Sequence, residues 1–158
     1  MLTPLDLRIL AALQSNAKLS MQELARETSA SSTQCWRRLK LLEQSGVIEG
    51  YHAKLNSKAL ELRATAFVQI ALKGHDQKII DDFLRLVETE NQIVECASIT
   101  GEYDFMILVH AADPEVLERF TMQRLLNSGL VARTQSNFVL KQAKTRGPLP
   151  INHLTAAS

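Results

Sequence analysis

The stretch from Ser31 to Gly50 constrains the fold of this chain more than any other. Ser31 and Gln34 have the spacing of a capping box, in which each side chain accepts a hydrogen bond from the other residue's backbone N–H. Gly46 supplies the left-handed residue that ends many helices. The pattern predicts a helix over about 32–45 that exits, after the glycine, into a short strand.

The predicted helix has two different faces. Cys35, Leu39 and Leu42 fall on an apolar face at 3.6 residues per turn. The opposite face carries basic and amide side chains, which donate hydrogen bonds to base edges and phosphates in the DNA major groove. The candidate DNA-binding residues, flanking positions included, are Ser32, Thr33, Gln34, Trp36, Arg37, Arg38, Lys40 and Gln44. An ordinary surface helix with a solvated polar face has similar residue types, so the assignment depends on context.

Two further capped helices precede this one. Thr3, Pro4 and Asp6 supply a cap, a proline at the first helical position and an acid in the first turn. Ser20 and Glu23 form another capping box, and the helix that they open is expected to end about three residues before the next. So tight a connection predicts a winged helix-turn-helix. Small bundles without a DNA role also have three helices, and the basic third helix favours DNA binding.

From residue 63 onward the apolar residues recur with a different period. Four β-rich runs and two helical patterns follow one another in the order βαββαβ. The expected ranges are 63–72, 76–88, 93–100, 103–111, 113–127 and 131–140. The order predicts an α+β fold, a ferredoxin-like antiparallel sheet with both helices on one face. Because no helix remains to cover the other face, we expect a second copy of the chain to cover it, which predicts a homodimer.

Length and composition set the domain organisation. With 158 residues and 46% apolar content, the chain suits one or two small domains. The predicted parts are a helix-turn-helix domain (1–50), a linker (51–62), a ferredoxin-like domain (63–143) and a tail (144–158). The sequence has no apolar run long enough to cross a bilayer and no signal-peptide pattern, so we expect a cytoplasmic protein without membrane contact.

The charges are unevenly distributed along the chain. Residues 1–60 hold 8 basic and 5 acidic side chains, whereas residues 61–140 hold 7 basic and 12 acidic ones. The small positive excess of the first part would bind DNA phosphates weakly in a single copy. Tight binding therefore requires several copies, which again indicates an oligomer.

Neither the cysteines nor the histidines form a catalytic or metal-binding pattern. Cys35 and Cys96 lie far apart and are expected to be buried, and a redox role for Cys35 is the minor alternative. The four histidines lie on separate segments without metal spacing. We therefore expect that the protein binds no metal or cofactor and is not an enzyme. A ferredoxin-like enzyme remains the less favoured function, because the fold alone does not decide it.

The local motifs, taken in order, resemble the Lrp/AsnC family, the leucine-responsive or feast/famine regulators. The resemblance implies a transcription regulator with an N-terminal helix-turn-helix and a C-terminal amino-acid-sensing domain of the RAM type. It also implies dimers that join into rings such as octamers, with small effectors, mainly amino acids, bound between dimers. The matching segments are 5–6, 9–10, 24–25, 38–43, 46–48, 50–51, 101–104 and 144–150.

The resemblance also assigns effector-binding residues. They are Gly101, Glu102, Tyr103 and Asp104 in the family's ligand motif, and Thr134, Gln135 and Ser136 in the last strand. The motif suits an amino acid chemically, since backbone N–H groups in a turn can hold a carboxylate and Asp104 can accept from an ammonium. Without the resemblance, a plain hairpin turn is the simpler interpretation.

Two matters remain open from the sequence. Glu61 stands where similar proteins commonly have glycine, so the geometry of the linker is uncertain from the sequence alone. A DNA-organising protein without any small-molecule effector would share the whole N-terminal argument, and it is the main alternative to an effector-responsive regulator.

Overall fold

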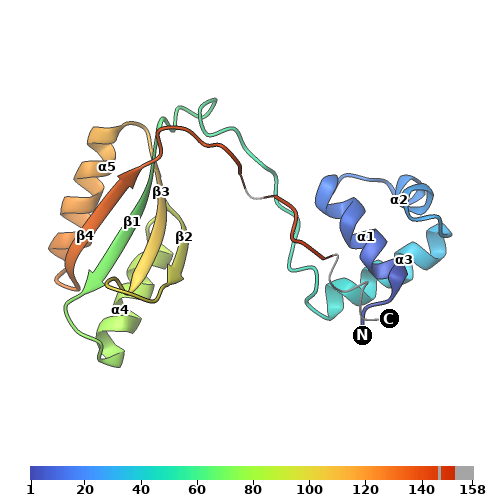
Figure 1. The fold of residues 1–158 in the computed structure, drawn as a ribbon, viewed down its shortest axis with the longest axis horizontal. Helices are drawn as coiled ribbons and strands as arrows, with labels where there is room; N and C mark the ends of the chain where they lie inside the picture. The colour runs from blue at the N-terminus through green and yellow to red at the C-terminus, as the bar shows by residue number, and fades with distance from the viewer. Residues whose placement is uncertain (146, 152–158) are drawn as a thin grey trace. The chain divides into compact units, whose positions relative to one another are not determined.

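The computed structural model describes residues 1–145 and 147–151. The chain forms two compact units, one from residues 1–54 with the tail from Lys144 onward, the other from residues 55–143. The first unit is helical and the second is built on a β-sheet (Figure 1). The predicted tail, 144–158, lies partly outside the described residues.

Three helices make up the described core of the helical unit: α1 (Pro4–Ser15), α2 (Met21–Thr28) and α3 (Ser32–Gln44). Helices α2 and α3 begin with the capping boxes predicted from the sequence, and α1 begins with the predicted Thr3 cap, which forms a capping box with Asp6 as well. In each box the N-cap hydroxyl accepts from a backbone N–H three residues later, and the side chain at that position accepts from the N-cap backbone. These reciprocal bonds satisfy donors that a helix start otherwise leaves without partners.

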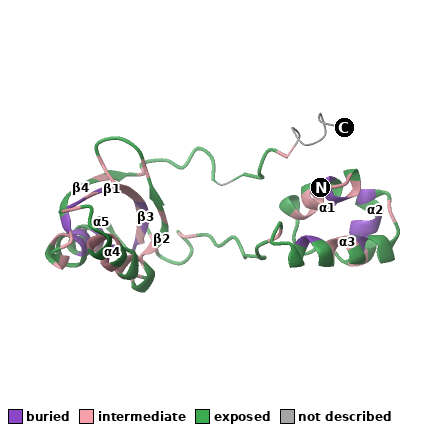
Figure 2. Cartoon of the chain, turned by 90° about the horizontal axis from the view of Figure 1, so that it is seen from below, coloured by how far each residue is buried: buried purple, intermediate pink, exposed green. Residues whose placement is uncertain are grey.

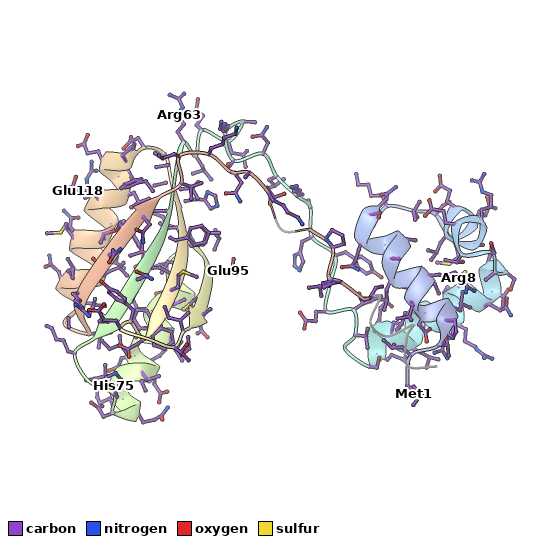
Figure 3. All side chains as sticks on the ribbon, in the orientation of Figure 1. Met1, Arg8, Arg63, His75, Glu95 and Glu118 are labelled. Carbon is purple, nitrogen blue, oxygen red and sulfur yellow. The ribbon has the colours of Figure 1, made fainter. Side chains whose placement is uncertain are left out.

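The small core of this unit lies between the three helices. Ile9, Leu24, Cys35 and Leu42 are almost completely buried there. In Figure 2 the buried segments of this unit are purple. Arg8, labelled in Figure 3, closes the end of α2, because its Nε donates to a carbonyl oxygen of the last turn at 2.9 Å. Each helix thus depends on the other two for its apolar face and, in part, for its ends.

The exit from α3 differs from the prediction. Gly46 follows the helix with a φ of 71°, as expected for a helix end. However, the expected short strand does not form: the structure describes all of residues 45–63 and contains no strand there. Instead, the segment is held to α3 by individual bonds, such as the one from the Tyr51 hydroxyl to Glu43 at 3.0 Å. Burial and this carboxylate raise the pKa of Tyr51 to about 12.

The segment leading to the sheet contains one well-defined turn. Asn56 caps it by accepting from two backbone N–H groups, and Glu61 ends it with a φ of 60°. The N–H of Leu62 donates back to the carbonyl of Ser57 at 2.9 Å, which is the bonding of a left-handed helix end. Glu61 therefore adopts the conformation in which glycine is the least strained residue.

The second unit has the predicted ferredoxin-like topology. Its four described strands are β1 (Ala64–Leu72), β2 (Ile93–Ser98), β3 (Phe105–Ala111) and β4 (Val131–Phe138). They form an antiparallel sheet in the order β2-β3-β1-β4. Helices α4 (Gln77–Thr89) and α5 (Pro114–Phe120) lie on one face of it (Figures 1 and 2).

The core of this unit lies between the sheet and its helices. Every second residue of β1, from Ala64 to Leu72, is buried toward the helices together with Phe83 of α4 and Leu117 of α5. This alternation is the pattern of a strand with one covered face.

The last helix is less regular than predicted. We expected one helix to about residue 127, but α5 ends at Phe120 and continues as a π-helix, η1 (Thr121–Leu125), and a 3₁₀-helix, η2 (Leu126–Ser128). The buried hydroxyl of Thr121 donates to the carbonyl of Leu117 at 3.0 Å. Such a side-chain bond competes with the backbone ladder and promotes the change of helix type.

The other face of the sheet is less well covered. Phe67 pairs with Leu108 on one side and with Asn137 on the other, so these residues share that face. Phe67 is 37% exposed, and it alternates along β1 with the residues that are buried toward the helices. We call this surface the open sheet face.

Residues 1–145 and 147–151 contain neither a membrane-spanning helix nor a cluster of metal ligands. None of their helices is both long and apolar enough to span a membrane. None of their His, Cys, Asp and Glu side chains form a group that could hold a metal ion.

Candidate DNA-binding and effector sites

The outward face of α3 presents most of the residues expected to meet DNA. Thr33, Arg37, Lys40 and Gln44 are exposed along it, opposite the buried side of the helix. Trp36 is 54% exposed beside them, and the Lys40 ammonium lies 5.6 Å from the centre of its ring. This contact holds a cation against an aromatic face at the surface. The helix thus combines a donor-rich stripe with one large flat side chain.

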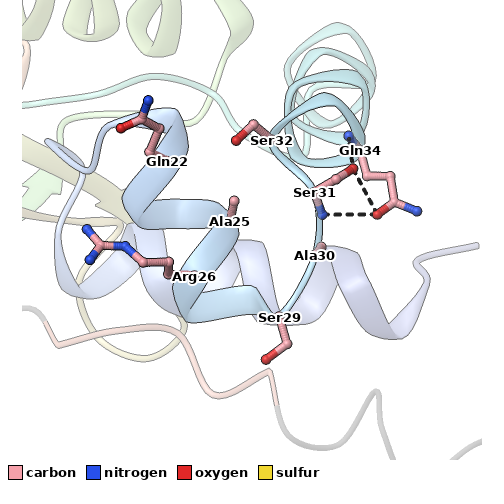
Figure 4. A pocket seen from close by; sticks show the side chains of 8 residues that line it. All are labelled: Gln22, Ala25, Arg26, Ser29, Ala30, Ser31, Ser32 and Gln34. Atoms are coloured by element: carbon pink, nitrogen blue, oxygen red, sulfur yellow. Dashed lines mark hydrogen bonds between the residues drawn. The ribbon is translucent and has the colours of Figure 1, made fainter.

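Ser32 and Gln34 lie at the start of α3 beside an open hollow, shown in Figure 4. Gln22 and Arg26 of α2 line the same hollow from the other side. Gln34 uses its side-chain oxygen for the capping box, accepting from the Ser31 backbone and hydroxyl at 3.1 Å. The start of α3 is therefore polar, exposed and fixed in position by its own cap.

Arg38 has a different environment from the other candidates. Its Nε donates to Oδ1 of Asp6 at 2.7 Å, and its terminal nitrogen pairs with Oδ2 of the same carboxylate. The Arg38 side chain is only 24% exposed, and that of Asp6 is completely buried. Arg38 thus points into the helical unit and connects α3 to α1, unlike the residues of the outward face.

The electrostatics of Asp6 follow from this contact. Burial alone would raise the pKa of its carboxyl, but hydrogen bonds from Arg38 and Thr3 outweigh burial and lower the pKa to about 2. The carboxylate is therefore charged throughout the neutral range. A charged group can remain in such a buried position only because its oxygens are fully engaged with donors.

The predicted effector motif forms the loop between β2 and β3. Gly101 has a φ of 118°, which side chains rarely tolerate, and apart from the glycine and its two chain neighbours no heavy atom of the described residues lies within 4 Å of where a Cβ would be. The glycine therefore serves the backbone conformation and leaves open space beside it. Tyr103 and Asp104, expected at the start of a strand, belong to this loop because β3 begins at Phe105.

Asp104 is engaged within the chain. Its Oδ2 accepts from the Leu72 backbone N–H at 2.8 Å, and its Oδ1 lies 2.8 Å from Nε2 of His75. The hydrogen bond from Leu72 and, against some burial, the contact with His75 lower the pKa of Asp104. The ammonium-accepting role that we expected for this carboxylate competes with these partners, so we treat Asp104 as a residue that positions the loop.

The rest of the loop contacts β4. The Tyr103 hydroxyl donates to the Gln135 side chain at 3.0 Å, and the Arg133 guanidinium lies 4.8 Å from the centre of the Tyr103 ring. Arg133 also pairs with the Glu102 carboxylate at 2.7 Å. The sequence analysis missed Arg133, although it lies two residues before Gln135 and so shares its side of the strand.

The three candidates on β4 do not share one face. Thr134 pairs with Ile70 and Ser136 with Val68, so both lie on the face covered by the helices. Only Gln135 lies on the open sheet face, where it meets the loop. The structure therefore gathers Glu102, Tyr103 and Gln135 and directs Thr134 and Ser136 elsewhere.

The two cysteines are placed mainly as expected. Cys35 is completely buried, with its Sγ 3.2 Å from the Thr28 hydroxyl. Cys96 is half-buried on β2, and burial raises the pKa of its thiol. A raised pKa disfavours the reactive thiolate.

Comparisons with known proteins agree with this architecture. A sequence model of the winged helix-turn-helix DNA-binding domain matches residues 2–49, and one of the Lrp/AsnC ligand binding domain matches residues 65–149. The DNA-binding transcriptional activator DecR of Escherichia coli K12 is 36% identical over 96% of this chain and 99% of its own length.

Solved structures of regulators are similar over nearly the whole chain. A transcriptional regulator of Neisseria meningitidis, crystallised in complex with L-Met, superposes with a TM-score of 0.94 at 32% identity, covering 98% of this chain and 99% of the other. Escherichia coli AsnC superposes with a TM-score of 0.83 at 25% identity, covering 92% and 97%. The helix-turn-helix with its exposed third helix, the ferredoxin-like sheet and these matches together establish that the chain belongs to the Lrp/AsnC family of DNA-binding transcriptional regulators.

Proposed function

We propose that the outward face of α3 reads operator DNA in the major groove. The main support for this proposal is an exposed stripe on a helix whose other side is packed in the core. The stripe consists of Thr33, Arg37, Lys40 and Gln44. Arginine and glutamine can pair with two atoms of one base edge, and lysine binds base edges or phosphates, so we assign Arg37 and Gln44 to bases and Lys40 to phosphate. Ser32, Gln34 and Trp36 extend this contact at its edges. Arg38 supports it from behind through Asp6.

Binding by dimers follows from the geometry of the target. Repeated half-sites on DNA lie about one helical turn apart, so two copies of the helical unit are required for one operator. The open sheet face, with Phe67 and Leu108, is the surface through which we expect two chains to pair. Further association into rings such as octamers is expected from the family resemblance.

We further propose that a free amino acid is the effector and that it binds at the 101–104 loop. Three features support this: the open space at Gly101, the polar cluster of Glu102, Tyr103, Arg133 and Gln135, and the L-Met complex of the similar Neisseria regulator. An amino acid carries both charges that such a cluster can pair with. Effector binding would then favour one assembly over another, with a coupling of about 1–3 kcal/mol.

The DNA proposal is tested on operators selected from genomic fragments. Arg37→Ala is expected to relax sequence preference, whereas Lys40→Ala should weaken all duplexes alike and flatten the salt dependence by about one unit. Lys18→Ala, an exposed lysine outside α3, is the matched control. If both α3 variants bind a selected operator as the parent does, the groove assignment is wrong.

The effector proposal is tested by a thermal-shift screen with the twenty standard amino acids. A ligand that binds the folded state raises the midpoint, and the rise grows with the logarithm of the ligand's excess over Kd. A shift with one or a few of them, lost in Gly101→Val, supports the effector-responsive regulator. If no amino acid raises the unfolding midpoint of the parent protein, the result favours the alternative, a DNA-organising protein without an effector.

Pairing through the open sheet face has its own test. Phe67→Glu places a charge on that face and is expected to convert dimers to monomers in light scattering. Leu84→Glu, on the exposed side of α4, is the control, because Leu84 has a similar exposure. A Phe67→Glu protein that keeps the parent's mass would move the dimer interface elsewhere.

A further inference from the structure

The described part of the tail meets α1 through a single glutamine. The backbone N–H of Leu149 donates to Oε1 of Gln14 at 2.5 Å, and Nε2 of Gln14 donates to the Leu149 carbonyl at 3.4 Å. One side-chain amide therefore holds both backbone groups of one residue. The Lys54 ammonium donates to the Thr145 hydroxyl at 2.7 Å, which ties the same segment to the end of the helical unit a second time.

The residues around Leu149 make this contact specific in register. Pro148 and Pro150 have no backbone N–H, so Leu149 is the only one of the three that can donate to Gln14. A shift by one residue in either direction would place a proline nitrogen opposite the glutamine oxygen. The Leu149 side chain is 73% exposed, so the contact depends on its backbone.

The prolines also reduce the entropic cost of docking. Each proline ring fixes its own φ, and a residue that precedes proline is restricted to extended conformations. The segment 147–150 is thus largely extended before it meets α1. A preformed extended peptide loses little conformational freedom on binding, which is why proline-rich segments recur as recognition elements.

We propose that the end of α1 at Gln14 is a docking site for the chain's own Pro148–Pro150 segment, and that this contact contributes to effector control of DNA binding. The tail continues from β4, which carries Arg133 and Gln135 of the effector cluster. The tail therefore connects that cluster to the helical unit by a route separate from residues 45–63. The regulatory part rests on the function proposed above, whereas the docking part does not.

Docking is tested by cross-linking the full-length protein. A Ser15→Cys/Leu149→Cys pair, which keeps the Gln14 side chain and the Leu149 N–H, is placed in a Cys96→Ser background, where the remaining Cys35 is completely buried. A short bismaleimide is expected to join the two positions within one chain, seen as a cross-linked peptide in the band of monomer mass. The two single-cysteine proteins are the controls. Absence of the cross-link overturns docking, and a cross-link found only between two chains overturns the assignment to the same chain.

Regulation is tested with a pair of variants at one position. Leu149→Pro removes the N–H that Gln14 accepts, whereas Leu149→Ala keeps it. We measure the ratio of operator affinities with and without each standard amino acid. Leu149→Pro and Gln14→Ala should reduce the ratio by about threefold, because they remove weak surface hydrogen bonds, and Leu149→Ala should leave it unchanged.

The possible failures are distinguishable. If the ratio of operator affinities is unchanged in both Leu149→Pro and Gln14→Ala, the regulatory part of the proposal is overturned. The docking part is then still decided by the cross-link. A parent protein whose affinity responds to no amino acid contradicts the proposed effector function, and the regulatory part falls with it. The cross-link decides docking in either case.

Discussion

Arg38 of α3 and Asp6 of α1 form a two-point ion pair in the interior of the helical unit, with Nε 2.7 Å from Oδ1. The same Asp6 carboxylate accepts from the Thr3 backbone and hydroxyl at 2.6 and 2.7 Å. One side chain therefore caps the first helix and fixes the third. Because Arg38 lies one residue from Arg37, the pair also sets the rotation of the proposed DNA-reading face.

The first prediction concerns this pair. Asp6→Asn leaves the Arg38 guanidinium partly buried without its counter-charge and should lower the free energy of unfolding by about 3 kcal/mol. Thermal or urea unfolding measures the change. Glu27→Gln, which removes an exposed acid on α2, should shift stability by less than about 0.5 kcal/mol. An Arg38→Ala protein with parental stability but weak DNA binding would show that Arg38 contacts DNA directly.

The second prediction is a pH dependence. The pKa of Asp6 is lowered from 3.8 to about 2, so its contribution is complete above pH 4 and disappears as the pH falls through 2. The shift corresponds to about 2 kcal/mol of stability lost over that interval. Urea unfolding at several pH values should show a steeper acid loss for the parent than for Asp6→Asn. Equal slopes would contradict the lowered pKa.

The third prediction concerns the effector loop. Asp104→Asn replaces one of the two oxygens that engage Leu72 and His75, so the loop should be held less firmly. We expect faster hydrogen exchange at the Leu72 amide and a loss of about 1–2 kcal/mol of stability. Effector affinity should fall with it. Glu118→Gln, at an exposed acid of α5, is the control. If the Leu72 amide of Asp104→Asn exchanges as slowly as in the parent protein, Asp104 does not hold the loop, and direct contact with the ligand becomes its expected role.

Local rules predicted the elements of this chain well. Each capping box needs only residues three apart, and each strand needs only an alternation of apolar side chains, so both were evident from the sequence. The failures have non-local or competing causes. The strand expected after Gly46 has no partner strand to pair with, and the change of helix type after Phe120 occurs where the buried Thr121 hydroxyl bonds to a backbone carbonyl, which competes with the helical ladder.

The candidate sites were less predictable because they depend on tertiary contacts. Nothing near Arg38 in sequence reveals that it pairs with an acid 32 residues earlier. In contrast, the separation of Gln135 from Thr134 and Ser136 was predictable, since neighbouring strand residues point to opposite faces. The same rule places Arg133 beside Gln135, so applying it would have found the missed cation.

The last prediction concerns Glu61, whose φ of 60° is the conformation that glycine adopts without strain. A non-glycine residue in this region is strained by about 1 kcal/mol or more, whereas glycine adds flexibility to the unfolded chain. Glu61→Gly is therefore expected to be neutral or stabilising by up to about 1 kcal/mol in thermal unfolding. Glu61→Ala keeps the strain and removes the carboxylate, which separates backbone from charge effects. A destabilised Glu61→Gly protein with parental Glu61→Ala would show that the turn does not keep this conformation in solution.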